Sequence, residues 1–124
     1  MPTNPEVGAI ISIGDELAIG QSLDTNSRWL STRLTDFGVT VAEHVTVPDD
    51  VEAITSTLRR LTGRCGVLIV TGGLGPTADD LTREALAEFT GEPLVEDEDS
   101  LATIRRWFER SQREMPAQNR VQAL

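Results

Sequence analysis

The chain has 124 residues, of which 39% are hydrophobic and 25% are charged. This balance is typical of a single globular domain and excludes a disordered tail, a collagen-like repeat and a disulfide-dense mini-protein. Eleven basic residues, all arginine, stand against 20 acidic residues, which gives a formal net charge of −9. Such a charge argues against a nucleic-acid partner, because neutralising phosphates requires a basic face. It leaves open a small phosphate-bearing ligand, which backbone N–H groups can hold.

Cysteine content and apolar runs predict a cytoplasmic protein with no membrane partner. Cys65 is the only cysteine, so no disulfide can form within the chain and a reducing compartment is expected. The segment 1–6 is polar and rich in proline, unlike a secretory signal. No apolar run approaches the roughly 20 residues that cross a bilayer.

Apolar patterning predicts three strands, at residues 7–13, 39–47 and 67–70. The first is a short run of branched and small apolar residues between a proline and a glycine, typical of a strand buried on both faces. In the second, valines alternate with other residues, and the third consists of four consecutive branched aliphatic residues.

A helix is predicted after each strand, because apolar residues then recur at a spacing of three or four. Asp24 to Asn26 supply residues that cap the first helix, and Gly38 stands where its end requires a left-handed residue. A further helix is expected from about residue 100 to 113. The apolar stripes of the four helices are, in chain order, Leu30, Leu34 and Phe37; Val51, Ile54, Leu58 and Leu61; Leu81, Ala85, Leu86 and Phe89; and Leu101, Ile104 and Phe108.

The alternation of strands and helices predicts an α/β fold, a three-layer α/β/α sandwich with a mainly parallel sheet. Ligands of such sheets bind outside the carboxyl ends of the strands. The chain is interpreted as one domain, 1–124, that is incomplete at its C-terminal end, because no fourth strand precedes Leu124. We therefore expect uncovered apolar surface and a homo-oligomer, either a dimer or a trimer.

The loop after the first strand carries two glycines, Gly14 and Gly20, that permit close approach of the backbone to a ligand. Asp24, Thr25 and Asn26 end it with carboxylate, hydroxyl and amide groups. A turn followed by a helix cap would explain these residues without a ligand. The ten-residue length of the connection favours a function, because such loops usually have about two to six residues.

The loop after the second strand contains two aspartates, Asp49 and Asp50. One of them is expected to cap the following helix. The other is then free at a strand end, where a carboxylate could bind a metal ion or position water.

The loop after the third strand, Thr71 to Gly75, has the design of a phosphate-binding loop. Its glycines expose successive N–H groups, and the dipole of the following helix favours an anion there. It is neither a Walker motif nor a dinucleotide-binding motif. Asp79 and Asp80 follow at once, and carboxylates beside a phosphate indicate a divalent cation, Mg²⁺ or Mn²⁺. Thr77 and Asp80 also have the spacing of a capping box, which would place a helix start there.

Three other features have no catalytic role in this interpretation. His44 is the only histidine, which excludes a cluster of histidine metal ligands. Trp29 and Trp107 occupy helical positions and are interpreted as packing residues. The acidic run 96–99 is interpreted as a solvated helix entry.

The glycine and aspartate motifs of the three loops, with Asn119-Arg120 and Gln122-Ala123 near the end, resemble a known family. They are similar to the N-terminal domain of CinA (competence/damage-inducible) proteins, within the molybdopterin-binding MoaB/MogA superfamily. The resemblance covers nearly the whole chain from about Val7. It implies a MogA-like fold with the ligand crevice at the three loops.

The resemblance also implies an activity. In the superfamily, the aspartates that match Asp49 and Asp80 are associated with catalysis, and here they are also the candidate metal ligands. CinA-type domains are linked to metal-dependent hydrolysis of ADP-ribose and related nucleoside diphosphates. The candidate ligand- or phosphate-binding residues are Gly14, Asp15, Glu16, Gly20, Asp24, Thr25, Asn26, Thr71, Gly72, Gly73, Leu74, Gly75, Pro76, Thr77, Asp79 and Thr82.

Two alternatives to the hydrolase stay open. One is adenylyl transfer to molybdopterin, although Leu74 and Asp79 replace the threonine and the arginine of that branch. The other is a non-catalytic module that binds a nucleotide or a pterin. The nicotinamide-mononucleotide amidohydrolase domain of many CinA proteins has no counterpart in this sequence, so that activity is not carried over.

Overall fold

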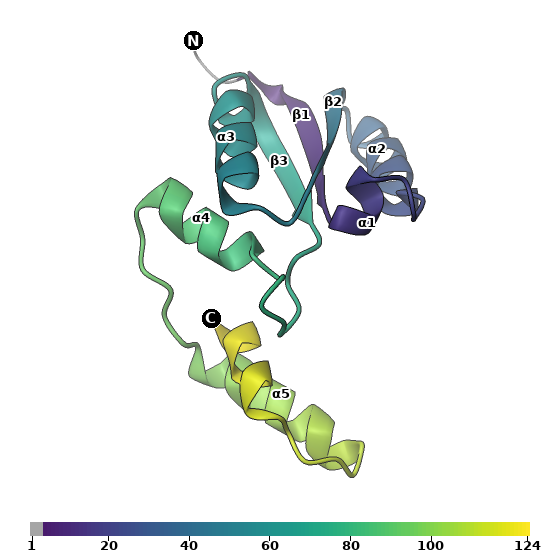
Figure 1. The fold of residues 1–124 in the computed structure, drawn as a ribbon. Coiled ribbons are helices and arrows are strands. Elements are labelled where there is room, and N and C mark those ends of the chain that lie inside the picture. The colour runs from purple at the N-terminus through teal and green to yellow at the C-terminus, as the bar shows by residue number, and fades with distance from the viewer. Residues whose placement is uncertain (1–3) are drawn as a thin grey trace.

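The fold is described for residues 4–124 of a computed structural model; the first three positions of the predicted domain lie outside the described residues. Its centre is a parallel sheet of three strands, β1 (Asn4–Ile13), β2 (Thr40–Val47) and β3 (Cys65–Thr71), in the order β2-β1-β3 (Figure 1). All three predicted strands are confirmed. The central strand is the most deeply buried, which explains why its sequence is a continuous apolar run.

The register brings the carboxyl ends of the three strands to the same edge of the sheet. Ile13 at the end of β1 pairs with Val47 at the end of β2, and Ser12 pairs with Thr71 at the end of β3. The N–H of Gly14 continues this pairing by donating to the Val47 carbonyl at 3.0 Å. The loops that follow the strands therefore begin side by side.

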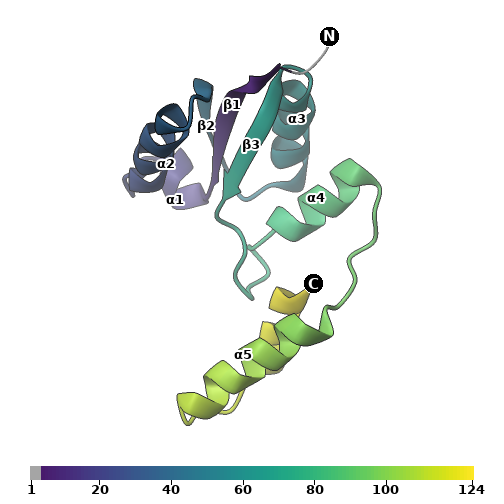
Figure 2. The same ribbon diagram turned by 180° about the vertical axis from the view of Figure 1, so that it is seen from behind.

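Helices cover both faces of the sheet, so the predicted three-layer arrangement is confirmed. The short α1 (Asp15–Ala18) and α2 (Thr25–Asp36) contact β1 and β2 from one side. On the other side, α3 (Val51–Thr62) contacts β3, and α4 (Thr82–Thr90) packs against α3 (Figure 2). The opposite placement follows from two right-handed crossovers that run in opposite directions along the sheet, the first from β1 to β2 and the second from β2 past β1 to β3.

The hydrophobic core lies between the sheet and the layer formed by α3 and α4. Alternate residues of β1 face it, and α3 contributes one side of its amphipathic surface. The α2 layer is thinner, since Ser27 is its only buried residue. The core cluster consists of Ala9, Ile11, Ile13, Val47, Ile54, Leu58, Leu61, Cys65 and Ala85.

The two ends of α2 agree with the sequence except at Phe37. At its start, the carboxylate of Asp24 caps the helix by accepting from the Ser27 N–H at 3.1 Å, and after its end Gly38 has the expected left-handed φ, +83°. Phe37, however, is 75% exposed, because it lies beyond the last turn of the helix. Its ring contacts solvent and the Arg33 guanidinium, 5.6 Å from the ring centre.

The last elements, α5 (Glu98–Arg110) and the 3₁₀ helix η1 (Ala117–Ala123), form a helical arm that packs mainly on itself. Figures 1 and 2 show the arm extending away from the sheet. The predicted helix 100–113 thus begins two residues earlier and ends three residues earlier, and the sequence did not indicate η1. None of the helices in residues 4–124 is long and apolar enough to cross a membrane.

The acidic run 96–99 forms the helix entry that its sequence predicted. The Asp97 carboxylate caps α5 by accepting from the Ser100 N–H at 2.8 Å. Glu96 instead pairs with Arg120 of η1, with an Nη2–Oε1 distance of 2.9 Å. The Asp97 N–H donates to the Ala123 carbonyl at 2.8 Å, so this segment fastens η1 to the start of α5.

Candidate functional site

Two of the three strand-end loops are joined by a reciprocal pair of hydrogen bonds. The N–H of Asp15 donates to Asp49 Oδ2 at 3.1 Å, and the N–H of Asp49 donates to Asp15 Oδ1 at 2.9 Å. Each carboxylate therefore fixes the backbone of the other loop. Glu16 lies over Gly14, where an added Cβ would come within 2.6 Å of Glu16 Oε1.

The two aspartates of the second loop have separate roles, as the sequence predicted. Asp50 caps α3, because its Oδ2 accepts from the Ala53 N–H at 2.8 Å. Asp49 faces the neighbouring acidic groups. Burial raises the pKa of Asp49, and the negative charges of Asp15, Glu16 and Asp80 raise this pKa further.

The backbone of the glycine loop, residues 71–75, turns sharply at the end of β3. Gly72 and Gly73 adopt left-handed φ values of +88° and +66°. A Cβ at Gly72 would lie 2.1 Å from the Ile13 carbonyl oxygen, so only glycine fits against the end of β1. Close packing on the central strand thus determines where the loop sits.

Thr77 and Asp80 form a turn that precedes α4 rather than its first turn. Asp80 Oδ2 accepts from the Thr77 N–H at 2.9 Å and from its hydroxyl at 2.8 Å. The predicted capping box is only half formed, and the prediction that Thr77 caps the helix is wrong, because α4 begins at Thr82. The hydrogen bonds from Thr77 lower the pKa of Asp80. A hydrogen bond from the Gly75 N–H and the positive charge of Arg83 lower this pKa further.

The first two residues of α4 bind the glycine loop from behind. Both are buried, with exposed fractions of 2% for Thr82 and 8% for Arg83. Thr82 donates to two carbonyl groups of the loop: its Oγ1 to Gly72 at 2.7 Å and its backbone N–H to Gly73 at 3.2 Å. The Arg83 guanidinium donates to the next two: its Nη1 to the Leu74 carbonyl at 2.7 Å and its Nη2 to the Gly75 carbonyl at 2.6 Å.

The sequence interpretation placed Thr82 among the ligand-binding residues and did not single out Arg83. The one feature of the sequence that could have indicated a role for Arg83 is its place in the first turn of a helix, where the helix dipole disfavours positive charge. A cation at that position requires nearby acceptors, which the loop carbonyls provide.

The remaining predicted residues do not share these contacts. Within residues 4–124, no hydrogen bond joins Gly20, Asp24, Thr25 or Asn26 to the glycine loop. Asp24 caps α2, while Thr25 and Asn26 begin that helix with exposed side chains. In the third loop, Leu74 is 51% exposed, Asp79 is exposed, and Thr71 and Pro76 are half-buried.

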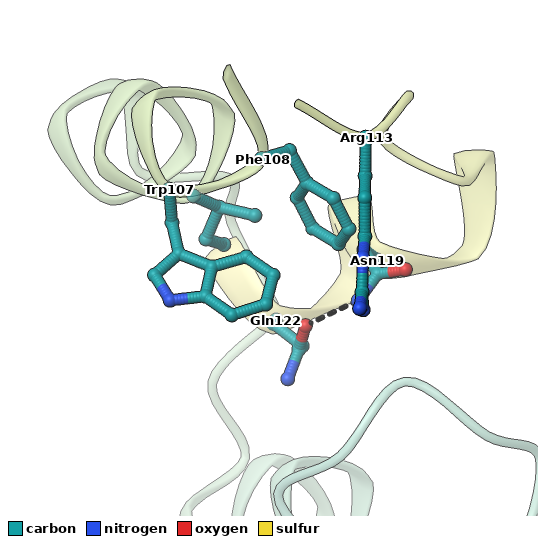
Figure 3. Close-up of a pocket in the computed structure, with 6 residues that line it drawn as sticks. Trp107, Phe108, Arg113, Asn119 and Gln122 are labelled. Carbon is teal, nitrogen blue, oxygen red and sulfur yellow. Dashed lines mark hydrogen bonds between the residues drawn. The ribbon is translucent and has the colours of Figure 1, made fainter. Parts of the chain in front are cut away.

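A separate hollow of about 400 Å³ lies on the helical arm (Figure 3). The rings of Trp107 and Phe108 meet edge to face with centroids 4.9 Å apart, and the Asn119 amide donates to Gln122 Oε1 at 2.9 Å. Trp107 is 56% exposed, and Trp29 on α2 is 63% exposed. The interpretation of both tryptophans as packing residues is therefore wrong, since the helix faces that carry them are not covered in this structure.

The fold and the strand-end loops can be compared with known proteins. Residues 9–121 match the family described as "Probable molybdopterin binding domain". A protein of Oceanobacillus iheyensis, named as competence-damage inducible, is 44% identical over 114 residues, which are 92% of this chain and 27% of that protein.

Solved structures agree with this match. A CinA protein of unknown function from Thermoplasma acidophilum is 30% identical, with a TM-score of 0.84, and the match covers 94% of this chain and 68% of that one. The tungsten cofactor synthesizing protein MoaB from Pyrococcus furiosus shares the fold, with a TM-score of 0.61 at 21% identity over 89% of this chain and 66% of that chain.

These matches define a molybdopterin-binding type of α/β domain. The chain belongs to this family and, within it, to the CinA proteins. It spans 26 to 29% of the length of these curated relatives.

Proposed function

We propose that the three strand-end loops bind a nucleoside diphosphate of the ADP-ribose type and hydrolyse it with the help of Mg²⁺ or Mn²⁺. The family match supports the coarser statement that this is a nucleotide- or pterin-binding module. The observation that carries the finer proposal is the reciprocal pair of Asp15 and Asp49, which lies at the same sheet edge as the glycine loop. Anion-binding N–H groups and carboxylates are thereby combined at one edge.

The acidic residues fit a metal ion that is shared with the ligand. Carboxylate oxygens suit Mg²⁺ and Mn²⁺, and Asp49 Oδ1 accepts no hydrogen bond within residues 4–124. In the same part of the chain, no three His, Cys, Asp or Glu side chains are arranged to hold a metal. Mg²⁺ is often held by one or two carboxylates together with substrate phosphates, so Asp49 and Asp80 would hold it once a diphosphate is bound. The metal would then neutralise charge on the diphosphate oxygens.

Asp49 and Asp80 have different chemical roles in this proposal. In this proposal the Asp49 carboxylate takes a proton from the water that attacks a phosphorus atom. As the new P–O bond forms, the bond from that phosphorus to the bridging oxygen breaks, and the leaving phosphate departs as an anion. Asp80, whose pKa is lowered, stays ionised as a fixed negative charge.

Two measurements on the same protein test the proposal. Calorimetry with ADP-ribose, ADP and a pterin, each with and without Mg²⁺ or Mn²⁺, should show metal-dependent binding of the two diphosphates. A hydrolysis assay should then show that Asp49→Asn, which removes the base, loses turnover by about 100-fold or more. Asp80→Asn, which removes a proposed metal ligand, should also lose turnover. Asp99→Asn on α5 is the control for the change in charge, and it should retain wild-type turnover.

The outcomes separate the hydrolase from the non-catalytic module. Binding of a diphosphate without any hydrolysis would support the non-catalytic binding module and contradict the hydrolase. Near wild-type turnover in Asp80→Asn would show that this carboxylate only supports its turn. Binding of the pterin alone would favour the molybdopterin side of the family.

A further inference from the structure

Thr82 and Arg83 together hold every carbonyl group of residues 72–75. We call these two residues the loop clamp. All four hydrogen bonds come from the same side of the loop, because both residues belong to the first turn of α4. The left-handed conformations of Gly72 and Gly73 allow successive carbonyls to face that side.

The clamp determines where the N–H groups of the loop point. In a trans peptide the N–H lies opposite the carbonyl, so carbonyls held toward α4 turn the next N–H groups away from it. The N–H groups of Gly73 and Leu74 donate no hydrogen bond within residues 4–124. Successive free N–H groups of this kind form a concave site for an anion.

Arg83 provides a second, independent indication of an anionic ligand. Its side chain is buried, and in the described part of the chain no carboxylate lies within ion-pair distance of it. Its Nε–H is fully buried and has no hydrogen-bond partner in residues 4–124. A buried cation with no carboxylate within ion-pair distance is costly, and the negative charge of an anion beside the loop would offset part of that cost.

We propose that Thr82 and Arg83 are positioning residues that hold the Gly73 and Leu74 N–H groups ready for a phosphate group. Thr82 holds the two peptides that carry these N–H groups. Arg83 holds the next two peptides and supplies positive charge behind the loop. The inference rests on the proposed function, because it assigns the phosphate of the diphosphate ligand to these two N–H groups.

The test measures binding of inorganic pyrophosphate by calorimetry at low and high salt. Thr82→Val removes the hydroxyl at nearly constant volume, and Thr82→Ser restores it. Arg83→Gln removes the charge, and Arg64→Gln makes the same change in an exposed arginine that pairs with Glu43. A thermal melt of each variant shows whether it is folded.

Thr82→Val and Arg83→Gln should each weaken pyrophosphate binding about tenfold or more, as expected for hydrogen bonds that involve charged groups. Thr82→Ser and Arg64→Gln should bind like the wild type. Salt should weaken binding less in Arg83→Gln than in the wild type, because a charge has been removed from the site. A purely structural role would lower the melting temperature without this change in salt dependence.

Equal affinity of the wild type, Thr82→Val and Arg83→Gln would overturn the inference while leaving the proposed function intact. No pyrophosphate binding by the wild type would overturn both. If Arg83→Gln or Thr82→Val does not fold, Arg83→Lys tests the inference instead. This variant should keep the salt dependence of the wild type but bind pyrophosphate more weakly, because lysine lacks the planar guanidinium that donates to two carbonyls at once. Wild-type affinity in Arg83→Lys would contradict the clamp.

Discussion

Gly72→Ala tests the geometry on which the candidate site depends. The new methyl group would lie 2.1 Å from the Ile13 carbonyl oxygen, closer than any carbon–oxygen van der Waals contact allows. Ile13 ends the central strand, and the carbonyl of Gly72 is itself held by Thr82. Neither side of the contact can move without breaking hydrogen bonds of the site.

Gly38→Ala is the matched control for this variant. Gly38 has nearly the same positive φ, +83° against +88°, but nothing lies within 4 Å of the position that its added methyl group would occupy. Both substitutions carry the left-handed strain of about 1–2 kcal/mol, and both reduce the entropy of the unfolded chain equally. Their difference therefore isolates the steric contact with Ile13.

We expect Gly72→Ala to lower the free energy of unfolding by about 1–3 kcal/mol more than Gly38→Ala, the usual cost of overpacking. Urea denaturation followed by circular dichroism measures both values. Pyrophosphate binding should be lost in Gly72→Ala and kept in Gly38→Ala. Equal stability losses in the two variants would refute the close packing of the glycine loop on β1.

Three further predictions follow from the acidic groups and the uncovered faces. Asp49→Asn should raise the free energy of unfolding at neutral pH, because the raised pKa of Asp49 makes its ionisation costly in the folded state. This gain in stability should shrink as the pH falls from the raised pKa toward the ordinary aspartate pKa. Urea titrations at several pH values measure both effects. Asp80→Asn should destabilise at neutral pH, and this loss should fade as pH falls through the lowered pKa of Asp80. Light scattering should show a dimer or trimer, since Trp29 and Trp107 are exposed; a monomer at high concentration would contradict this.

The sequence was sufficient for the layers of the fold and for the edge that carries the site. Continuous and alternating apolar runs specify the three strands, and the helices predicted between them indicate parallel crossovers. The division between Asp49 and Asp50 was also predictable, because a helix start needs only one cap. These features depend on local chemistry and on a general rule of topology.

Other features depend on contacts between distant residues and could not be predicted. α1 has four residues and no buried side chain, so it leaves no apolar stripe in the sequence. The pairing of Asp15 with Asp49 joins two loops 34 positions apart. Arg83 binds carbonyl groups, which every sequence contains, so no residue type marks its partners. Thr77 and Asp80 have the spacing of a capping box, but their turn ends before the helix begins.

The most direct test of the proposed ligand site is an amide NMR titration of the chain with ADP-ribose in the presence of Mg²⁺. We predict the largest chemical-shift changes at the N–H groups of Gly73 and Leu74, with smaller changes at Asp15 and Asp49. Changes centred on Trp107 and the other residues of the arm hollow, with the glycine loop unaffected, would contradict the claim that the strand-end loops form the ligand site.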